Sequence, residues 1–137
     1  MKKIMVLIPL LVSATIAMSQ SPANKIVYDL SSGDTAVQAT VLRQMTNILK
    51  VAPDTRLEVV CHGQGIFLLV EGKTFFKTNI EAFNANENIS FKVCANSLKR
   101  FKVDRNNVIS QAGIVPVAIL ELSGKQMEGW SYIKAGN

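Results

Sequence analysis

The sequence has 137 residues, which is enough for one domain with a hydrophobic core and too few for two. Hydrophobic residues make up 48% of the chain and charged residues 18%, a composition that excludes a disordered protein. The formal net charge is +5, which is too weakly basic to indicate a nucleic-acid-binding protein.

The first 19 residues have the pattern of a secretory signal peptide. Two lysines precede an apolar stretch, and small residues stand at Ala17 and Ser19. We expect cleavage after Ser19, a short flexible lead over residues 20–24, and export to the periplasm or out of the cell. The alternative is a retained membrane anchor, but Pro9 interrupts the stretch, which is shorter than the roughly 20 residues that span a bilayer. Cleavage would lower the net charge to +3 and leave no membrane segment.

The first half of the remaining chain, residues 25–137, predicts strands that alternate with helices. Lys25–Leu30 is expected to be a strand, and residues 35–50 have helical spacing, with Thr35 and Gln38 fitting a capping box. Arg56–Cys61 is the second expected strand. The apolar run Ile66–Val70 is too short to assign.

The second half continues the alternation. A helix is expected from about Phe76 to Asn86, and Ile89–Cys94 alternates with the period of a strand. A helix capped by Asn96 or Ser97 should follow, then a short strand at residues 113–115. The last elements expected are a helix from Pro116 to about Glu128, capped by Gly129, and a strand at residues 130–134. The whole predicts one α/β domain, a three-layer α/β/α fold with a mainly parallel sheet of about five strands.

The residues that carry chemistry follow two of the strands. Cys61 and His62 end one strand and Cys94 ends the next, and these are the only two cysteines and the only histidine of the chain. Ligands and reactive groups collect at the carboxyl ends of parallel strands. If the two strands are neighbours, both thiols and the imidazole should meet there.

Cys94 is the strongest candidate for a reactive atom. It precedes an expected helix start, where free N–H groups favour an anion, and Lys92, Lys99, Arg100 and Lys102 gather around it in the sequence. Both effects lower the pKa of a thiol, and the thiolate is the nucleophile. The alternative is a small buried hydrophobic residue at a strand end. Because Ser97 stands where a dithiol motif has its second cysteine, only monothiol chemistry is available locally.

His62 and Cys61 are also candidate site residues, and each has an ordinary structural role as an alternative to a functional one. His62 either exchanges a proton with Cys94 or fixes the turn before Gly63. Cys61 is a resolving thiol, a disulfide partner of Cys94 or core packing, and core packing is the default. Two cysteines and one histidine do not complete a zinc site, so no metal and no cofactor are expected.

The sequence resembles the DsrE/DsrF-like (YchN-like) family over residues 25–134. The resemblance lies in His62-Gly63, in Cys94-x-Asn96-Ser97-Leu98, and in Gln126-x-Glu128-Gly129-Trp130-x-Tyr132-Ile133. It implies a DsrE-like fold, homo-oligomers (dimer, trimer or hexamer), and sulfur held as a persulfide on Cys94, with His62, Gly63, Asn96 and Ser97 in support. The implied partner is a sulfur donor or acceptor protein or a small thiol. Family members of the sulfur relay are cytoplasmic, whereas this chain has the pattern of an exported branch.

Three functions remain in view. The leading hypothesis is a sulfur-carrier or sulfurtransferase-like protein. The first alternative is a non-catalytic oligomeric binding module with an inert or disulfide-bonded cysteine. The second is a redox switch made by Cys61 and Cys94, which requires their Cα atoms to lie about 4.4–6.8 Å apart.

Overall fold

The computed structural model describes residues 23–136 of the chain. The predicted signal peptide, at residues 1–19, lies outside the described residues. Within the described part, no helix is both long and apolar enough to cross a membrane.

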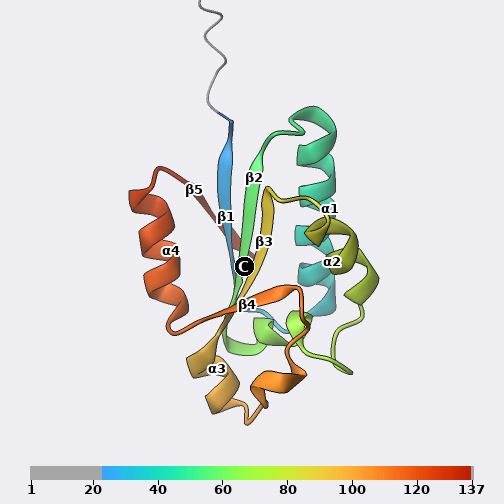
Figure 1. Cartoon of the computed structure of the whole chain (residues 1–137), viewed down its shortest axis with the longest axis vertical. Helices are drawn as coiled ribbons and strands as arrows, with labels where there is room; N and C mark the ends of the chain where they lie inside the picture. Colours follow the sequence, from blue (N-terminus) through green and yellow to red (C-terminus); the bar gives the residue numbers. More distant parts are fainter. Residues whose placement is uncertain (1–22, 137) are drawn as a thin grey trace, which may run out of the picture.

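Five strands form one parallel sheet in the order β4-β3-β2-β1-β5 (Figure 1). Their bounds are β1 Lys25–Leu30, β2 Arg56–Cys61, β3 Ile89–Cys94, β4 Ala112–Val115 and β5 Ser131–Ala135. The predicted α/β class and the mainly parallel sheet of five strands are confirmed, and the sheet is parallel throughout. The interior strands have few polar residues because both of their faces are covered.

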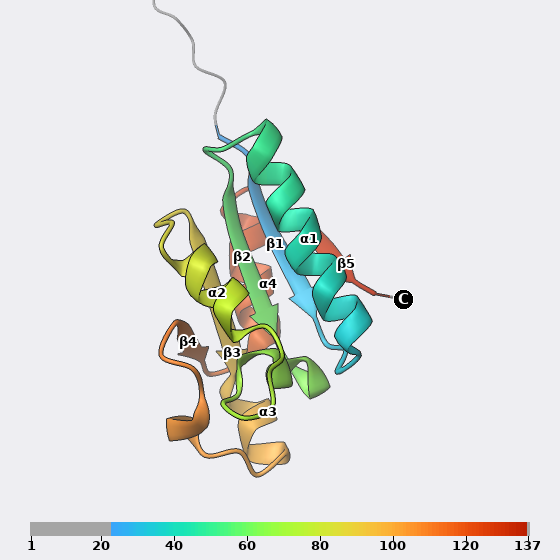
Figure 2. The same cartoon turned by 90° about the vertical axis from the view of Figure 1, so that its right-hand side faces the viewer.

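The helices form a layer on each face of the sheet, as Figures 1 and 2 show. They are α1 Thr35–Val51, α2 Lys77–Asn84, α3 Ala95–Arg100 and α4 Ala118–Met127, with 3₁₀ helices η1 Gly63–Leu69 and η2 Arg105–Asn107. From β1 to β4 the chain steps across the sheet in one direction, with α1 and α2 on one face. It returns to β5 through α4, which covers the other face. Right-handed crossovers in opposite directions require this division.

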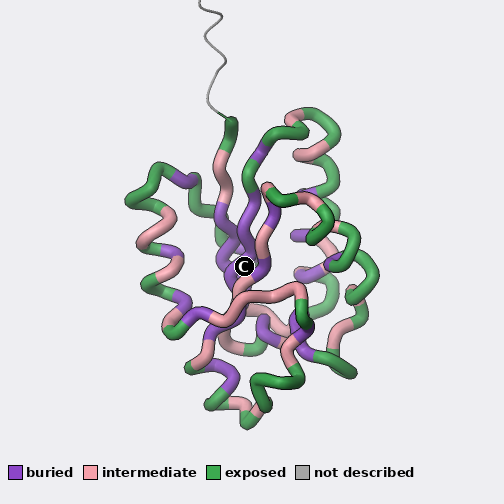
Figure 3. Tube along the Cα trace, in the orientation of Figure 1, coloured by how far each residue is buried: buried purple, intermediate pink, exposed green. Residues whose placement is uncertain are grey.

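Two clusters of buried side chains correspond to the two faces. Figure 3 shows that buried residues, in purple, are concentrated along the strands in the middle of the molecule. The larger cluster packs α1 and α2 against the sheet, with Met45, Leu57 and Phe91 fully or almost fully buried. The smaller cluster lies under α4 and consists of Val27, Val60, Cys94, Ala118, Leu122 and Trp130. Successive residues of a strand alternate between these clusters, which decides the face of each functional side chain.

The predicted caps need two corrections. Helix α1 is capped by Asp34, whose carboxylate accepts a hydrogen bond from the Ala36 N–H, and not by Thr35. Helix α3 begins at Ala95 with Cys94 itself at the cap position, so Asn96 and Ser97 lie inside its first turn. An Asp that directly precedes a helical pattern caps at least as well as the Thr that follows it.

Helix α4 differs from the prediction at its N-terminal end only. The helix begins at Ala118 and not at Pro116, which lies in the turn after β4. At the other end, Gly129 takes a φ of 83°, and its N–H and that of Trp130 donate to Gln126 and Lys125 carbonyls. This is the Schellman arrangement, and the predicted glycine cap is confirmed.

Candidate functional site

Cys94 ends β3 at the carboxyl edge of the sheet and faces α4. It is 5% exposed, and its sulfur lies 4.0 Å from the Pro116 carbonyl oxygen, which accepts from the thiol. It belongs to the cluster under α4, opposite α1 and α2. The chain leaves β3 toward α3 and leaves the neighbouring β4 toward α4, so Cys94 sits where the connections diverge. Such switch points are the usual binding positions of open parallel sheets.

Backbone and hydroxyl donors determine the ionisation of Cys94. Burial alone would raise the pKa of the thiol. The N–H of Ala118, the N–H groups of Ser97 and Asn96, and the Ser97 hydroxyl outweigh burial and lower the pKa below its usual value. These N–H groups belong to the first turns of α4 and α3, where they have no partner within the helix. The lowered pKa raises the fraction of thiolate at a given pH, and the thiolate is the nucleophilic form.

The basic residues near Cys94 in the sequence have a smaller role than predicted. The contributions that lower the pKa most come from neutral N–H and O–H groups, not from lysine or arginine. Lys99 and Arg100 lie in the last turn of α3, away from its first turn, and Arg100 stacks over Phe101. The Lys92 side chain runs across Gly113 of β4. The direction of each of these side chains follows from its position in its helix or strand. Closeness to Cys94 in the sequence therefore does not bring it to the thiol.

Ser97 joins the turn after β2 to the turn after β3. Its side chain is buried, and its oxygen accepts a hydrogen bond of 2.9 Å from the Gly63 N–H. Gly63 has a φ of 52°, a left-handed conformation that glycine adopts without strain. Of the support residues predicted, Gly63 and Ser97 lie at the site, and Asn96 contributes its backbone N–H.

His62 lies beside Cys94 on the same face of the sheet. The ladder pairs Cys61 with Val93, so the next residues along each strand, His62 and Cys94, are neighbours. His62 has an extended backbone (φ −142°, ψ 179°), and its N–H donates to the Leu30 carbonyl, so it continues the direction of β2. The predicted convergence of the histidine and this thiol therefore agrees with the register.

The prediction that both thiols meet is wrong. Cys61 precedes His62 by one residue, so its side chain points to the opposite face and packs in the cluster under α1. It is fully buried, and burial raises the pKa of its thiol strongly. Both cysteines are free. Side chains that point to opposite faces cannot form a disulfide, which removes the structural basis of the redox switch and leaves Cys61 as core packing.

Asp29 is a site residue that the sequence analysis did not select. It lies on β1 on the α4 face and is 5% exposed. One carboxylate oxygen is 2.6 Å from His62 Nε2, and the other accepts from the Tyr132 hydroxyl at 2.5 Å and lies 3.6 Å from Lys134 Nζ. Burial opposes the charge on Asp29, but the hydrogen bonds from Tyr132 and His62, and the electrostatic effects of His62 and Lys134, lower its pKa. Asp29 therefore remains ionised.

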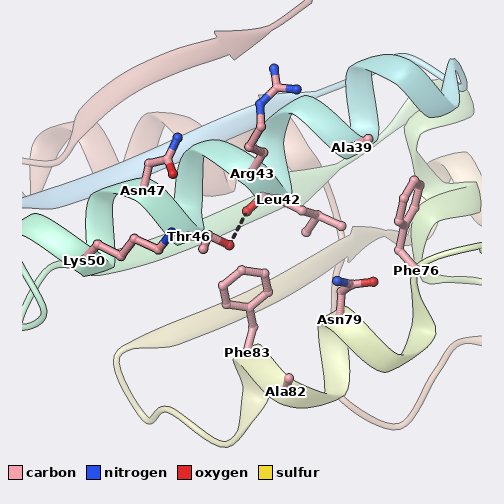
Figure 4. A pocket seen from close by; sticks show the side chains of 10 residues that line it. All are labelled: Ala39, Leu42, Arg43, Thr46, Asn47, Lys50, Phe76, Asn79, Ala82 and Phe83. Carbon is pink, nitrogen blue, oxygen red and sulfur yellow. Dashed lines mark hydrogen bonds between the residues drawn. The ribbon is translucent and has the colours of Figure 1, made fainter.

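A groove on the other side of the molecule is separate from this site. It has a volume of about 650 Å³ and lies between α1 and α2, where Phe83 of α2 points toward α1 and Phe76, directly before α2, lines one end (Figure 4). Arg43 and Lys50 of α1 lie along it. It contains no cysteine, histidine or acidic residue, so it offers no group for thiol chemistry.

The comparisons with known proteins agree with this fold and order of elements. A model of the DsrE/DsrF-like family matches residues 14–135. The chain belongs to the DsrE/DsrF-like family. A solved structure of a protein of unknown function, MTH1491 from Methanobacterium thermoautotrophicum, has a TM-score of 0.76 at 19% identity, covering 81% of this chain and 98% of that one. At that identity the likeness concerns the fold. No curated protein matches the chain.

One sequence signal pointed to Asp29 within this DsrE/DsrF-like chain. A strand covered on both faces rarely carries a carboxylate near its end, because a buried charge needs partners. Tyr132 gives no such signal, because Trp130 and Tyr132 alternate with Ser131 and Ile133 as ordinary strand packing would require. In residues 23–136, no three His, Cys, Asp or Glu side chains are grouped to hold a metal ion.

Proposed function

We propose that this DsrE/DsrF-like protein is a sulfur carrier in which the Cys94 thiolate accepts sulfane sulfur as a persulfide. The proposal is supported by the hydrogen-bond donors around Cys94, namely the N–H groups of Ala118, Ser97 and Asn96 and the Ser97 hydroxyl. They lower the pKa of its thiol despite burial. The family is associated with sulfur relay, and Cys94 is the cysteine that the family resemblance selects.

The transfer balances without an oxidant. The Cys94 thiolate attacks the outer sulfur of a persulfide donor, R–S–SH, so a sulfur–sulfur bond forms on Cys94 and the donor's own sulfur–sulfur bond breaks. The donor leaves as a thiolate and takes the proton that Cys94 lost, giving R–SH and Cys94–S–SH. A neighbouring base is needed to hold that proton between the two steps.

The same donors suit the product. A persulfide is ionised at neutral pH more readily than a thiol, and its outer sulfur carries the charge. The N–H of Ala118 and the hydroxyl of Ser97, which lower the pKa of the Cys94 thiol, would also stabilise this anion, since N–H groups at helix starts favour anions. A buried persulfide is also kept from the solvent, because Cys94 is 5% exposed.

Sulfur loading of matched cysteine variants tests the proposal. Wild type, Cys94→Ala and Cys61→Ala are incubated with a low-molecular-weight persulfide, freed of reagent, and weighed intact before and after reduction. We expect wild type and Cys61→Ala to gain a reducible sulfur atom and Cys94→Ala to gain none. Equal loading of Cys94→Ala, or no loading of the folded wild type, would reject the sulfur carrier in favour of a binding module with an inert thiol.

Export and homo-oligomer formation stay predictions that rest on the sequence and on the family resemblance. The donor and acceptor are inferred only as a class, namely a persulfide and a thiol that exchange one sulfur atom with Cys94. Export would bring this chemistry into a compartment where exposed thiols oxidise, and a buried Cys94 resists that reaction.

A further inference from the structure

Asp29 is a buried carboxylate held by three side chains from two other strands. His62 follows β2, while Tyr132 and Lys134 belong to the edge strand β5. The contacts use both oxygens: His62 on one, Tyr132 and Lys134 on the other. Burying a charge in a parallel sheet is costly unless it is paired and hydrogen-bonded, so the ionised Asp29 depends on these partners.

The contact between Asp29 and His62 determines where the imidazole carries its proton. An ionised carboxylate only accepts hydrogen bonds. The 2.6 Å contact from Nε2 to Asp29 therefore requires a proton on Nε2. In the neutral ring the other nitrogen, Nδ1, then has the free lone pair and is the basic atom.

We propose that Asp29 is the positioning residue of His62, fixing the Nε2–H tautomer so that Nδ1 serves as the base that receives the Cys94 proton. This inference rests on the proposed function, since it names the base that the transfer at Cys94 needs. His62 and Cys94 are neighbours on one face by register. Tyr132 and Lys134 act one step further away by holding the carboxylate in place.

The proton movement balances within the site. Cys94–SH gives its proton to Nδ1, leaving a thiolate and an imidazolium with protons on both nitrogens. The positive charge of the imidazolium then faces the ionised Asp29, which stabilises it without taking the proton. When the donor's thiolate leaves, Nδ1 returns the proton to it, and His62 is neutral again.

Other charged groups on the surrounding elements act in the same field. Lys134 lies 3.6 Å from Asp29, and its side chain is 54% exposed, so solvent screens it. On α4, Glu121 lies 3.7 Å from Lys125. The titratable groups on this face of the sheet and on α4 include Asp29, Tyr132, Lys134, Cys94, Lys92, Glu58, Glu121 and Lys125. Of these, Asp29 pairs with Nε2 of the ring, and Cys94 is the neighbour of His62 by register.

The tautomer can be measured directly because the chain contains one histidine. Long-range ¹H–¹⁵N correlation spectra of labelled wild type, recorded at a pH where the ring is neutral, distinguish Nε2–H from Nδ1–H. We expect the Nε2–H form in wild type and in the control Asp54→Asn, which changes an exposed Asp of a turn. Asp29→Asn should give a mixture, because an amide can either donate or accept. An Nδ1–H form in wild type would overturn the proposal.

A second readout is the rate of Cys94 alkylation by iodoacetamide as a function of pH. Loss of the carboxylate should slow alkylation about tenfold near pH 6.5, the ordinary pKa of histidine, and the rates should converge above about pH 9, where thiols ionise unaided. Tyr132→Phe, which leaves Asp29 in place, should change the profile in the same direction by less, and it replaces Asp29→Asn if that variant does not fold. Identical profiles in wild type and the folded variants would refute the role of Asp29.

These readouts separate this inference from the proposed function. Neither requires a sulfur donor, so the tautomer and the pH profile can be as expected while sulfur loading fails. In that case His62 and Asp29 activate Cys94 for other thiol chemistry. Conversely, sulfur loading of a wild type that has the Nδ1–H tautomer would keep the carrier and reject Asp29 as its positioning residue.

Discussion

Ser97 connects the two turns that form the site, and its hydroxyl has two tasks. The oxygen accepts from the Gly63 N–H at 2.9 Å, while the hydroxyl contributes to lowering the pKa of Cys94. A hydroxyl can accept through a lone pair and donate through its proton at the same time. Alanine at this position would remove both interactions without adding bulk.

Ser97→Ala is expected to slow Cys94 alkylation at neutral pH by several-fold, because the thiolate loses a donor. The unpaired Gly63 N–H should also lower the free energy of unfolding by about 1 kcal/mol. Ser123→Ala, which removes an exposed hydroxyl from α4, is the matched control. Alkylation rates over a pH series and urea unfolding measure the two effects. If both variants alkylate at the wild-type rate, Ser97 does not stabilise the thiolate.

At the scale of elements, α4 is attached to the sheet by a buried ionisable group. Glu58 of β2 is 2% exposed, accepts from the Ser90 hydroxyl at 2.7 Å, and lies 3.5 Å from Lys125 of α4. Its second oxygen is buried and has no partner. Burial is the largest cause of a raised pKa for Glu58, and Glu121 adds to it. The raised pKa makes the neutral carboxyl more favourable, relative to the ionised form, than in an exposed glutamate.

The sign of the pH dependence follows from this raised pKa. Below the unfolded pKa, Glu58 is neutral in both states and causes no loss, whereas stability falls as the pH rises from the unfolded pKa to the folded pKa and is constant above it. Glu58→Gln keeps an acceptor for Ser90 and cannot ionise. We expect its melting temperature to exceed that of wild type near pH 8, and the difference to shrink toward pH 4, close to the ordinary pKa of Glu.

Thermal unfolding at several pH values measures this difference, with the exposed Glu87→Gln as the control. A gap between Glu58→Gln and wild type that stays constant with pH would mean that Glu58 does not titrate between these limits. A variant less stable than wild type at every pH would show that the ion pair with Lys125 outweighs the burial of charge.

At the scale of the whole molecule, local patterns predicted the elements but not their arrangement across the sheet. The strands β1, β2 and β3 have the predicted bounds because their apolar runs and turn residues are local features. The face to which a side chain points depends on the strand register. Cys61 was expected at the site, but it precedes His62 by one residue and therefore points to the opposite face of the sheet.

The contacts around Asp29 also could not be read from the sequence. Asp29 is 33 residues from His62 and 103 residues from Tyr132. These residues meet only because the chain returns through α4 to place β5 beside β1, at the edge of the sheet. The same crossover brings the Ala118 N–H to Cys94, since α4 starts directly after β4, the neighbour of β3. Cys94 and His62 were predictable as chemical types, whereas their partners required the tertiary fold.

Intact mass of the protein isolated from its native compartment decides whether Cys94 carries sulfur in the cell. We expect a mature chain that begins at or near Gln20 and carries a reducible extra sulfur atom, mapped to Cys94 by peptide analysis. Samples are weighed before and after mild reduction and alkylation, so that a Cys61–Cys94 disulfide would show as a loss of two hydrogens. Two unmodified thiols in freshly isolated protein, or a disulfide between them, would contradict the account.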